Sequence, residues 1–334
     1  MTDILRWGIM GTGTIAHKMV EGLLALPDAK VAAVGSRSQA TADAFADEYG
    51  IPRRHASYEA LAADPGVDVV YIASPHSCHR DITLLALRGG KHVLCEKPFA
   101  INRREAEEMA AEARARGLFL MEAMWTRFLP AMCHTRRWLA EGQIGAPRIV
   151  YADFGFQEAY DPASRLFDPA FGGGALLDVG VYAVSFAAMV FGSAPNRITG
   201  LADLCENGAD GVNAAVLGYP GGGLAVLSSA VLAETPQEAR IIGPRGSILV
   251  PSPFWCSDRA RLTTPEMVME EVDASCEGNG YTHQAREVMD CVRAGRTESA
   301  VMPLDETLEI MGTLDALRAL WGVRYPMEQA GAGE

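Results

Sequence analysis

Residues 95–100, CEKPFA, place a lysine between a glutamate and a proline directly after an apolar run. If that run is a parallel strand, Lys97 lies at the sheet edge that borders the ligand crevice of an open α/β fold. Pro98 fixes φ and can form a cis peptide bond, which would aim the lysine, while Glu96 would orient or neutralise its ammonium group. We therefore expect Lys97 to reach a nicotinamide or a substrate, rather than to form a surface salt bridge beside a turn proline.

A second cluster lies in GGGALLDVGVY, residues 172–182, where three glycines precede a helical run. Asp178 and Tyr182 are four positions apart, which puts both side chains on one helix face. Oxidation of an alcohol requires the hydroxyl proton to leave as the hydride is transferred, and a carboxylate and a phenol converging on Lys97 could handle that proton. The alternative is an acid near a helix N-terminus and a tyrosine in an amphipathic core.

The motif GxGxxA, formed by Gly11, Gly13 and Ala16, follows an apolar run and opens a helical pattern. This context is typical of a dinucleotide-binding turn, in which a pyrophosphate meets the amides of a helix N-terminus. The next predicted strand ends in Ser36 and Arg37, where NAD-binding sheets usually carry an acid for the ribose diol. A hydroxyl and a guanidinium suit a 2′-phosphate, so NADP(H) is the expected cofactor and NAD(H) the alternative.

Strand and helix patterns alternate through the first third of the chain, whereas short strand patterns follow Arg148. We expect an α/β Rossmann domain with a doubly wound parallel sheet, followed by an α+β domain with a large, mainly antiparallel open sheet. The expected boundaries are residues 1–121 for dinucleotide binding and 122–334 for substrate binding and oligomerisation, with a packed junction near residue 122.

The composition argues against several classes of protein. Lys and Arg total 29 against 42 Asp and Glu, a formal charge of -13, and no basic run suits a nucleic-acid backbone. The seven cysteines are far apart and form no CxxC pair, which favours free thiols in a reducing compartment over disulfides or a zinc site. We expect no secretory leader and no apolar run that approaches the length of a membrane span, and therefore a cytoplasmic protein without a membrane partner.

The three motifs together resemble the glucose-fructose oxidoreductase, inositol dehydrogenase and MocA superfamily. MEAMWTRFLP at residues 121–130 and GNGYTHQAREVMDCVRAG at 278–295 are most similar to its dimeric dihydrodiol dehydrogenase branch, which resembles NADP-dependent xylose dehydrogenases. The resemblance implies that Lys97 is the catalytic lysine, Tyr182 the proton donor or acceptor and Asp178 an acidic helper. Many relatives carry histidine at the tyrosine position, so this chain departs from the inositol dehydrogenases.

The remaining candidate residues fall into two groups. Flat aromatic faces suit a sugar ring or a cyclohexadiene diol, although they also fill cores, and a neighbouring arginine could orient substrate or cap a helix. The substrate candidates are Trp125, Arg127, Phe154 and Trp255. His283 is a weaker candidate, and no metal-ligand spacing is present. The expected cofactor-binding residues are Gly11, Thr12, Gly13, Thr14, Ile15, Ser36, Arg37, Ser74, His76, His79, Glu96 and Lys97.

These observations predict an NADP-dependent oxidoreductase that transfers hydride between the nicotinamide and a secondary alcohol or hemiacetal carbon. The expected substrate is a small cyclic polyol, either an aldose such as xylose or a trans-dihydrodiol. A ketose or anhydrosugar reductase using NADPH is one alternative, and a non-catalytic dinucleotide-sensing protein is another, against which Lys97, Asp178 and Tyr182 argue. The resemblance also implies a homodimer or homotetramer formed through the second-domain sheet.

Overall fold

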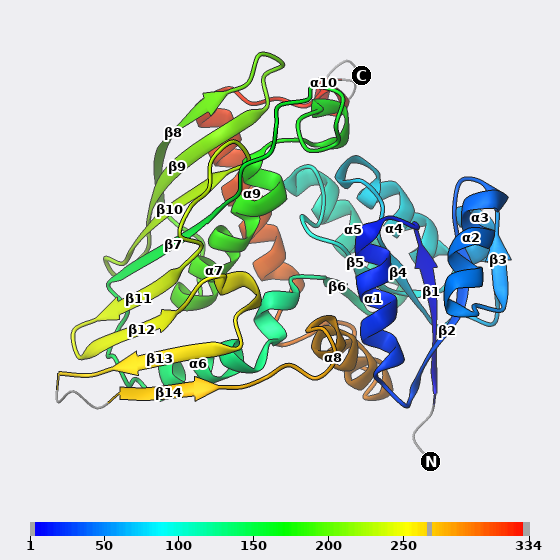
Figure 1. Cartoon of the computed structure of the whole chain (residues 1–334), viewed down its shortest axis with the longest axis horizontal. Helices are drawn as coiled ribbons and strands as arrows, with labels where there is room; N and C mark the ends of the chain where they lie inside the picture. Colours follow the sequence, from blue (N-terminus) through cyan, green and yellow to red (C-terminus); the bar gives the residue numbers. More distant parts are fainter. Residues whose placement is uncertain (1–3, 266–268, 330–334) are drawn as a thin grey trace. The chain divides into compact units, whose positions relative to one another are not determined.

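The computed structural model describes residues 4–265 and 269–329. The chain forms two compact units, each built from two separate stretches of sequence (Figure 1). The first unit comprises Met1–Phe128 and Cys276–Thr307, and the second comprises Leu129–Ser275 and Leu308–Glu334. The expected second domain, residues 122–334, therefore coincides with neither unit.

The first unit contains a six-stranded parallel sheet with strand order β3-β2-β1-β4-β5-β6. Its strands are short, and β1, β4, β5 and β6 consist largely of buried apolar residues, as expected for a sheet with helices on both faces. The expected Rossmann architecture is confirmed. The bounds are β1 Leu5–Met10, β2 Ala29–Gly35, β3 Arg53–His55, β4 Val69–Ile72, β5 His92–Cys95 and β6 Leu120–Glu122.

The strand register aligns the carboxyl ends of this sheet. Met10 pairs with both Gly35 and Ile72, Ile72 pairs with Cys95, and Cys95 pairs with Glu122. The segments that follow these strands therefore leave the sheet at one edge. The helices of this unit are α1 Thr14–Leu24, α2 Gln39–Tyr49, α3 Tyr58–Ala62, α4 His79–Arg88, α5 Arg103–Arg116 and α8 Tyr281–Arg293.

Helix α8 explains why the domain boundary differs from the expected one. It lies beside α1 (Figure 1), where the Thr282 hydroxyl donates a hydrogen bond to the carbonyl oxygen of Gly22 at 3.0 Å. Just before α8, the Asn279 amide donates to the carbonyl oxygen of Lys18 at 2.7 Å. These contacts join residues more than 250 positions apart, so no local pattern reveals them.

The second unit contains an eight-stranded sheet with order β14-β13-β12-β11-β7-β10-β9-β8. Among the described strands of this sheet, only the β7–β10 pairing is parallel, so the expectation of a large, mainly antiparallel sheet is confirmed. The bounds are β7 Ile149–Gly155, β8 Arg197–Leu204, β9 Asp210–Gly218, β10 Leu224–Ala230, β11 Ala239–Gly243, β12 Gly246–Val250, β13 Arg259–Thr263 and β14 Met269–Asp273.

Helices cover one face of this sheet, and apolar side chains remain exposed on its strands. Buried and exposed residues alternate along β9 and β10, as expected when one face is packed and the other is not. Figure 1 shows α7 and α9 on one side of the sheet. The helices are α6 Pro130–Ala140, α7 Val181–Phe191, α9 Leu304–Trp321, which begins in the first unit, and α10 Pro326–Gln329.

One helical segment, Pro169–Phe191, meets the length and hydropathy requirements of a membrane span, contrary to the expectation that no apolar run approaches that length. Its most apolar stretch is 83% buried within the protein. Burial of an all-round apolar helix is typical of a core element. The segment therefore fits the core of the second unit.

Candidate active site

The glycine-rich turn lies between β1 and α1. Gly11 has a φ of +108°, and a Cβ atom there would lie 2.5 Å from the carbonyl oxygen of Ala73, so only glycine fits. Around Gly13, no described atom beyond its own chain neighbours lies within 4 Å of the position that a Cβ would occupy. Among residues 4–265 and 269–329, no side chain caps α1 and its first turn contains no acid. The free amides at Thr14 and Ile15 therefore fit an anionic pyrophosphate.

The end of β2 presents hydroxyl groups and a guanidinium. Ser36 is 7% exposed, and its Oγ lies 2.6 Å from Oγ1 of Thr41, whereas Arg37 is exposed. Burial raises the pKa of Tyr58, and the positive charge of Arg37 opposes that rise. No acid occurs in residues 35–38, GSRS. The arrangement leaves an exposed cation, rather than a carboxylate, at the position that distinguishes the two nicotinamide cofactors.

Lys97 is the second residue after β5, and the Lys97–Pro98 peptide bond is cis, as expected. Glu96 is 5% exposed and accepts a hydrogen bond from the Tyr71 hydroxyl. Its other carboxylate oxygen accepts the backbone N–H of Lys97 at 3.2 Å. Burial raises the pKa of Glu96, and the charge of Lys97 acts in the opposite direction. The carboxylate therefore lies close to the ammonium group.

His79 supports the loop that contains Lys97. Its side chain is fully buried, and its ring nitrogens lie 2.8 Å from the carbonyl oxygen of Pro98 and 2.9 Å from that of Ser74. Burial lowers the pKa of His79, and the two carbonyl contacts act in the opposite direction. The His76 ring lies beside it, with centroids 5.8 Å apart. His79 thus links the end of β4 to the loop after β5.

Two of the substrate candidates are packed within the first unit. Trp125 is 5% exposed and stacks on Tyr281 of α8, with ring centroids 4.6 Å apart. Arg127 is 3% exposed, and its guanidinium lies 2.6 Å from a carboxylate oxygen of Glu306. Both side chains therefore contact other residues of the first unit, and their role toward substrate stays a prediction. His283, the weaker candidate, lies half-buried on α8.

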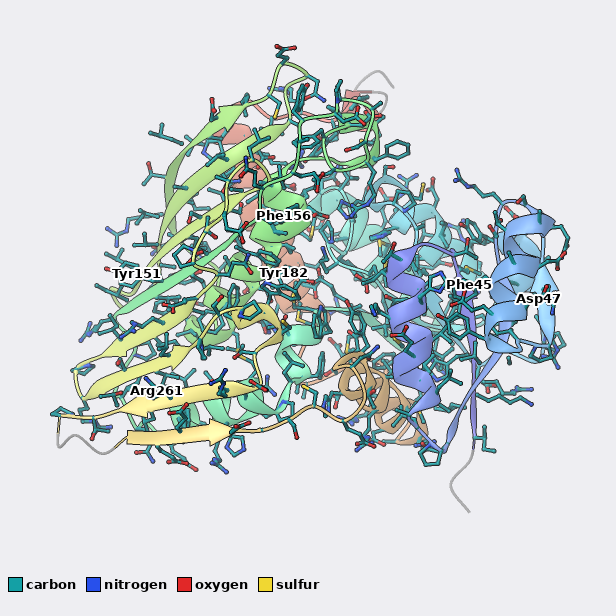
Figure 2. The ribbon with its side chains drawn as sticks, in the orientation of Figure 1. Phe45, Asp47, Tyr151, Phe156, Tyr182 and Arg261 are labelled. Atoms are coloured by element: carbon teal, nitrogen blue, oxygen red, sulfur yellow. The ribbon has the colours of Figure 1, made fainter. Side chains whose placement is uncertain are left out.

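Three aromatic side chains form a cluster in the second unit. Phe154 at the end of β7 and Trp255, in a 3₁₀ turn after β12, stack with centroids 4.9 Å apart and planes inclined by 3°. Tyr182, labelled in Figure 2, lies 5.4 Å from Phe154 and 6.4 Å from Trp255 by the same measure. The structure thus brings three of the expected site residues together.

Asp178 and Tyr182 do not share a regular α-helix. Residues Leu176–Gly180 form a π-helix, and α7 begins at Val181. Asp178 is 8% exposed, and one of its carboxylate oxygens lies 3.2 Å from a guanidinium nitrogen of the exposed Arg165. The expectation of a regular helix after the glycines is wrong here. Single-turn π segments occur frequently at functional sites.

Comparison with known families agrees with this geometry. Residues 5–124 match the oxidoreductase family with an NAD-binding Rossmann fold described as GFO_IDH_MocA, and residues 132–249 match the GFO/IDH/MocA C-terminal domain. The chain belongs to the Gfo/Idh/MocA oxidoreductase family.

Several Gfo/Idh/MocA proteins are similar to this chain over nearly its whole length. Trans-1,2-dihydrobenzene-1,2-diol dehydrogenases from Macaca fuscata fuscata and Homo sapiens are each 38% identical over 333 residues, which cover 97% of this chain and 99% of theirs. An aldose-aldose oxidoreductase from Caulobacter crescentus, solved with glycerol, has a TM-score of 0.87 at 25% identity, covering 95% of this chain and 97% of that one.

A 3-ketoreductase from Actinomadura kijaniata, solved with NADP and TDP-benzene, has a TM-score of 0.83 at 26% identity, covering 95% of this chain and 98% of that one. These findings confirm the family that the motifs resemble. As a Gfo/Idh/MocA member, the chain is a nicotinamide-dependent dehydrogenase or reductase.

Two buried carboxyl groups were missed in the sequence. Glu122, which ends β6, is fully buried and accepts hydrogen bonds from the Phe99 N–H at 3.1 Å and the Thr307 hydroxyl at 3.4 Å. Asp210, which begins β9, is also fully buried. A strand-end acid within MEAMWTRFLP was the only available signal for Glu122.

Within residues 4–265 and 269–329, no cluster of three or more His, Cys, Asp or Glu side chains could hold a metal ion.

Proposed function

We propose that this Gfo/Idh/MocA protein is an NADP(H)-dependent oxidoreductase acting on a secondary alcohol or hemiacetal carbon of a small cyclic polyol. A trans-dihydrodiol is the first substrate class, and an aldose such as xylose is the second. The aromatic cluster of Phe154, Trp255 and Tyr182 carries this proposal, because two stacked rings beside a phenol suit a flat ring that bears hydroxyl groups. The full-length similarity to dihydrodiol dehydrogenases supports the same substrate class.

We propose that the cofactor is held by the first unit. The amides of the glycine-rich turn would bind the pyrophosphate, and Ser36 and Arg37 would bind the 2′-phosphate of NADP. Ser74, His76 and Glu96 would complete the cofactor site at the strand ends, whereas His79, Trp125 and Arg127 would act mainly through packing. When bound, the nicotinamide supplies the hydride acceptor or donor.

We propose that Tyr182 exchanges the hydroxyl proton of the substrate through its phenol oxygen. A phenol has a reference pKa near ~10, so a nearby positive charge is needed to favour its anionic form at neutral pH. Lys97 is the proposed source of that charge, with its backbone position fixed by the contacts of Glu96 and by His79. Asp178 would orient substrate or Tyr182. Two variants of the similar 3-ketoreductase have been solved, one with a lysine replaced by alanine and one with a tyrosine replaced by phenylalanine. These are the two residue types to which we assign the proton transfer.

A reductase working in the opposite direction is the second candidate. The structural similarity to a 3-ketoreductase solved with NADP favours it. The two directions use the same residues, so the substrate panel has to include ketones.

The deciding experiment is a panel of trans-dihydrodiols, aldoses, inositols and ketoses assayed with NADP(H) and NAD(H), following nicotinamide absorbance. We expect the highest kcat/KM for a cyclic diol or an aldose with NADP. Activity confined to open-chain substrates, or absent from the whole panel while NADP binds, would contradict the proposal and favour a non-catalytic dinucleotide sensor.

We also propose that the protein is a homodimer or homotetramer formed through the sheet of the second unit. Its strands expose apolar side chains, which favours burial against a second copy. These are Tyr151, labelled in Figure 2, and Leu201, Leu204, Val216, Leu224 and Val226. Sedimentation velocity should show a dimer or larger species, and Leu201→Asp, at a position 83% exposed, should shift it toward monomer. A monomeric wild-type protein would refute this assignment.

All seven cysteines are free thiols, which supports a cytoplasmic location as a further proposal.

A further inference from the structure

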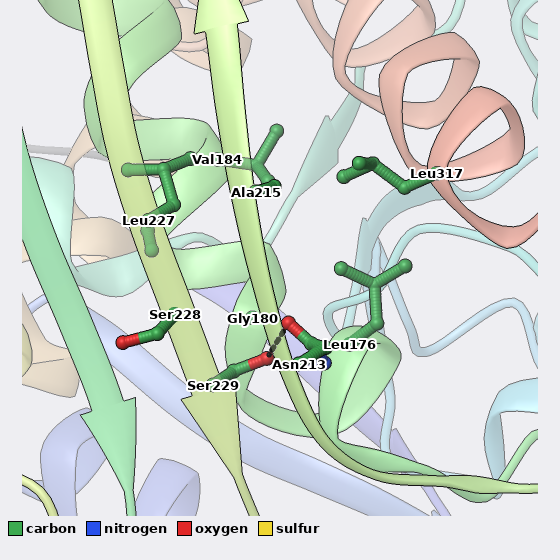
Figure 3. Close-up of a pocket in the computed structure, with 10 residues that line it drawn as sticks. Leu176, Gly180, Val184, Asn213, Ala215, Leu227, Ser228, Ser229 and Leu317 are labelled. Atoms are coloured by element: carbon green, nitrogen blue, oxygen red, sulfur yellow. Dashed lines mark hydrogen bonds between the residues drawn. The ribbon is translucent and has the colours of Figure 1, made fainter. Parts of the chain in front are cut away.

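A buried polar cluster lies beneath the π-helix that contains Asp178. Oδ2 of Asp210 accepts hydrogen bonds from the backbone N–H of Leu176 and from the Asn213 side-chain amide, each at 2.7 Å. The Ser229 hydroxyl donates in turn to the Asn213 carbonyl oxygen at 2.9 Å (Figure 3). All three side chains are at least 95% buried, so a polar chain from β9 and β10 continues into the sheet-facing side of the π-helix.

This cluster contacts both ends of the π-helix. Leu176, the first residue, donates its N–H to Asp210, and Gly180, the last, packs against Ser229. A Cβ at Gly180 would lie 2.6 Å from Oγ of Ser229, so the helix approaches the sheet closely only because glycine is present. The cavity left beside these residues in Figure 3 has a volume of about 10 Å³. It has room for roughly one water molecule, which excludes it as a substrate pocket.

The glycine turn before the π-helix lies against the same carboxylate and is hydrogen-bonded to a tyrosine. Gly174 has a φ of +125°, and a Cβ there would lie 2.2 Å from Oδ1 of Asp210. The carbonyl oxygen of Gly173 accepts a hydrogen bond from the Tyr325 hydroxyl at 3.1 Å. Arg318 lies over the Tyr325 ring, 4.8 Å from its centroid. The turn and the first residue of the π-helix are therefore hydrogen-bonded to Tyr325 and Asp210 respectively.

Burying a carboxylate in this region costs free energy. Buried charge is unfavourable unless it is fully hydrogen-bonded, and an apolar side chain of similar size would avoid that penalty. Burial raises the pKa of Asp210 to about 7, and Arg318 acts against this rise. The other titratable groups that interact with Asp210 are Tyr325 and Cys205. The carboxylate accepts a hydrogen bond from the Leu176 N–H at the start of the π-helix, where hydrogen-bond acceptors are favourable.

We propose that Asp210 is a positioning residue for the proton-transfer side chains. Through the Leu176 amide and the contact with Gly174, it fixes the π-helix so that Asp178 and Tyr182 keep one orientation. Asn213 holds Asp210 in place. This inference rests on the proposed role of Tyr182.

The test compares Asp210→Ala and Asp210→Asn in the full-length protein. Alanine removes the acceptor of the Leu176 amide, whereas asparagine retains a carbonyl oxygen that can accept it. Because a misplacement of about 1 Å can reduce a rate by 10²-fold, we expect Asp210→Ala to lower kcat by roughly 10- to 100-fold with NADP affinity within about 2-fold of wild type. Asp210→Asn should recover kcat to within about 3-fold of wild type.

Thr135→Ala is the matched control. Its buried hydroxyl donates to the carbonyl oxygen of Ala131 within α6 of the same unit, outside the polar cluster. A loss of kcat in this variant equal to that of Asp210→Ala would overturn the proposal, as would equal losses in the alanine and asparagine variants. If Asp210→Ala does not fold, Asn213→Ala replaces it, and wild-type kcat in that variant would overturn the proposal.

Crystal structures of wild type and Asp210→Ala separate this inference from the proposed function. We expect residues 176–182 to move relative to β9 and β10 in the variant. An unchanged segment would refute the positioning role whatever Tyr182 does. A displaced segment together with normal turnover in Tyr182→Phe would support the positioning role and refute the role of Tyr182 in catalysis.

Discussion

Glu122 allows a quantitative test of burial at the carboxyl end of β6. Burial raises the pKa of its carboxyl group from 4.5 to about 7; Arg127 opposes this rise and Glu96 adds to it. Because this pKa is higher in the folded than in the unfolded protein, folding favours the protonated form. The carboxyl group therefore contributes stability that is fully present below the unfolded pKa and is lost as pH rises through about 7.

The size of this loss follows from the two pKa values. A pKa difference between 4.5 and about 7 corresponds to roughly 3 kcal/mol, at about 1.4 kcal/mol per unit. Glu122→Gln removes the ionisation while leaving an oxygen for the Phe99 N–H. We expect the free energy of unfolding of the variant, minus that of wild type, to increase by roughly 3 kcal/mol between about pH 4 and about pH 8.

Urea-induced unfolding at several pH values across this range measures that difference. The exposed Glu59, in α3 of the same unit, provides the control, because Glu59→Gln removes one carboxyl group without changing a buried site. A difference between the Glu122→Gln and wild-type free energies that stays constant across the range would refute the reasoning. It would mean that the Glu122 carboxyl titrates at the same pH in the folded and unfolded chain.

Three further predictions concern the cofactor and the proton transfer. Arg37→Ala should weaken NADP binding by roughly 10- to 100-fold relative to NAD binding, because a charge-assisted hydrogen bond contributes about 1.5 to 3 kcal/mol. Equal losses of affinity for both cofactors in binding titrations would contradict the assignment of Arg37 to the 2′-phosphate. Tyr182→Phe and Lys97→Met should each lower turnover by roughly 10² to 10⁴ while NADP binding is retained. If the two side chains act as one proton-transfer unit, the turnover of the double variant should be little lower than that of either single variant. Losses that multiply in the double variant would contradict such a unit. Gly11→Ala should abolish cofactor binding in calorimetry, because its Cβ would lie 2.5 Å from the carbonyl oxygen of Ala73, and wild-type affinity would show that the turn can rearrange.

The features that the sequence predicted well are local. Gly11 and Gly13 lie at the first βα turn because only a tight turn before a helix needs that spacing, and Lys97 follows a strand because an apolar run ends there. The features that it did not predict depend on distant contacts. Nothing near Asp210 indicates that its carboxylate meets Leu176, 34 positions earlier, and nothing near Tyr281 indicates that α8 joins the first unit. The π-helix likewise depends on packing against the sheet rather than on its own sequence.

The interleaving of the two units along the chain has a consequence for biosynthesis. The first unit lacks α8 until Cys276–Thr307 has left the ribosome, which happens only after the whole of Leu129–Ser275 has been made. Domains usually fold in order of emergence, N-terminal first. Here the first Rossmann segment is complete before the intervening sheet has been translated. During that time the face of α1 that contacts Thr282 is uncovered. Fragments ending near residue 128 should therefore be prone to aggregation, and a stable dinucleotide-binding fragment would have to be made by joining the two stretches directly.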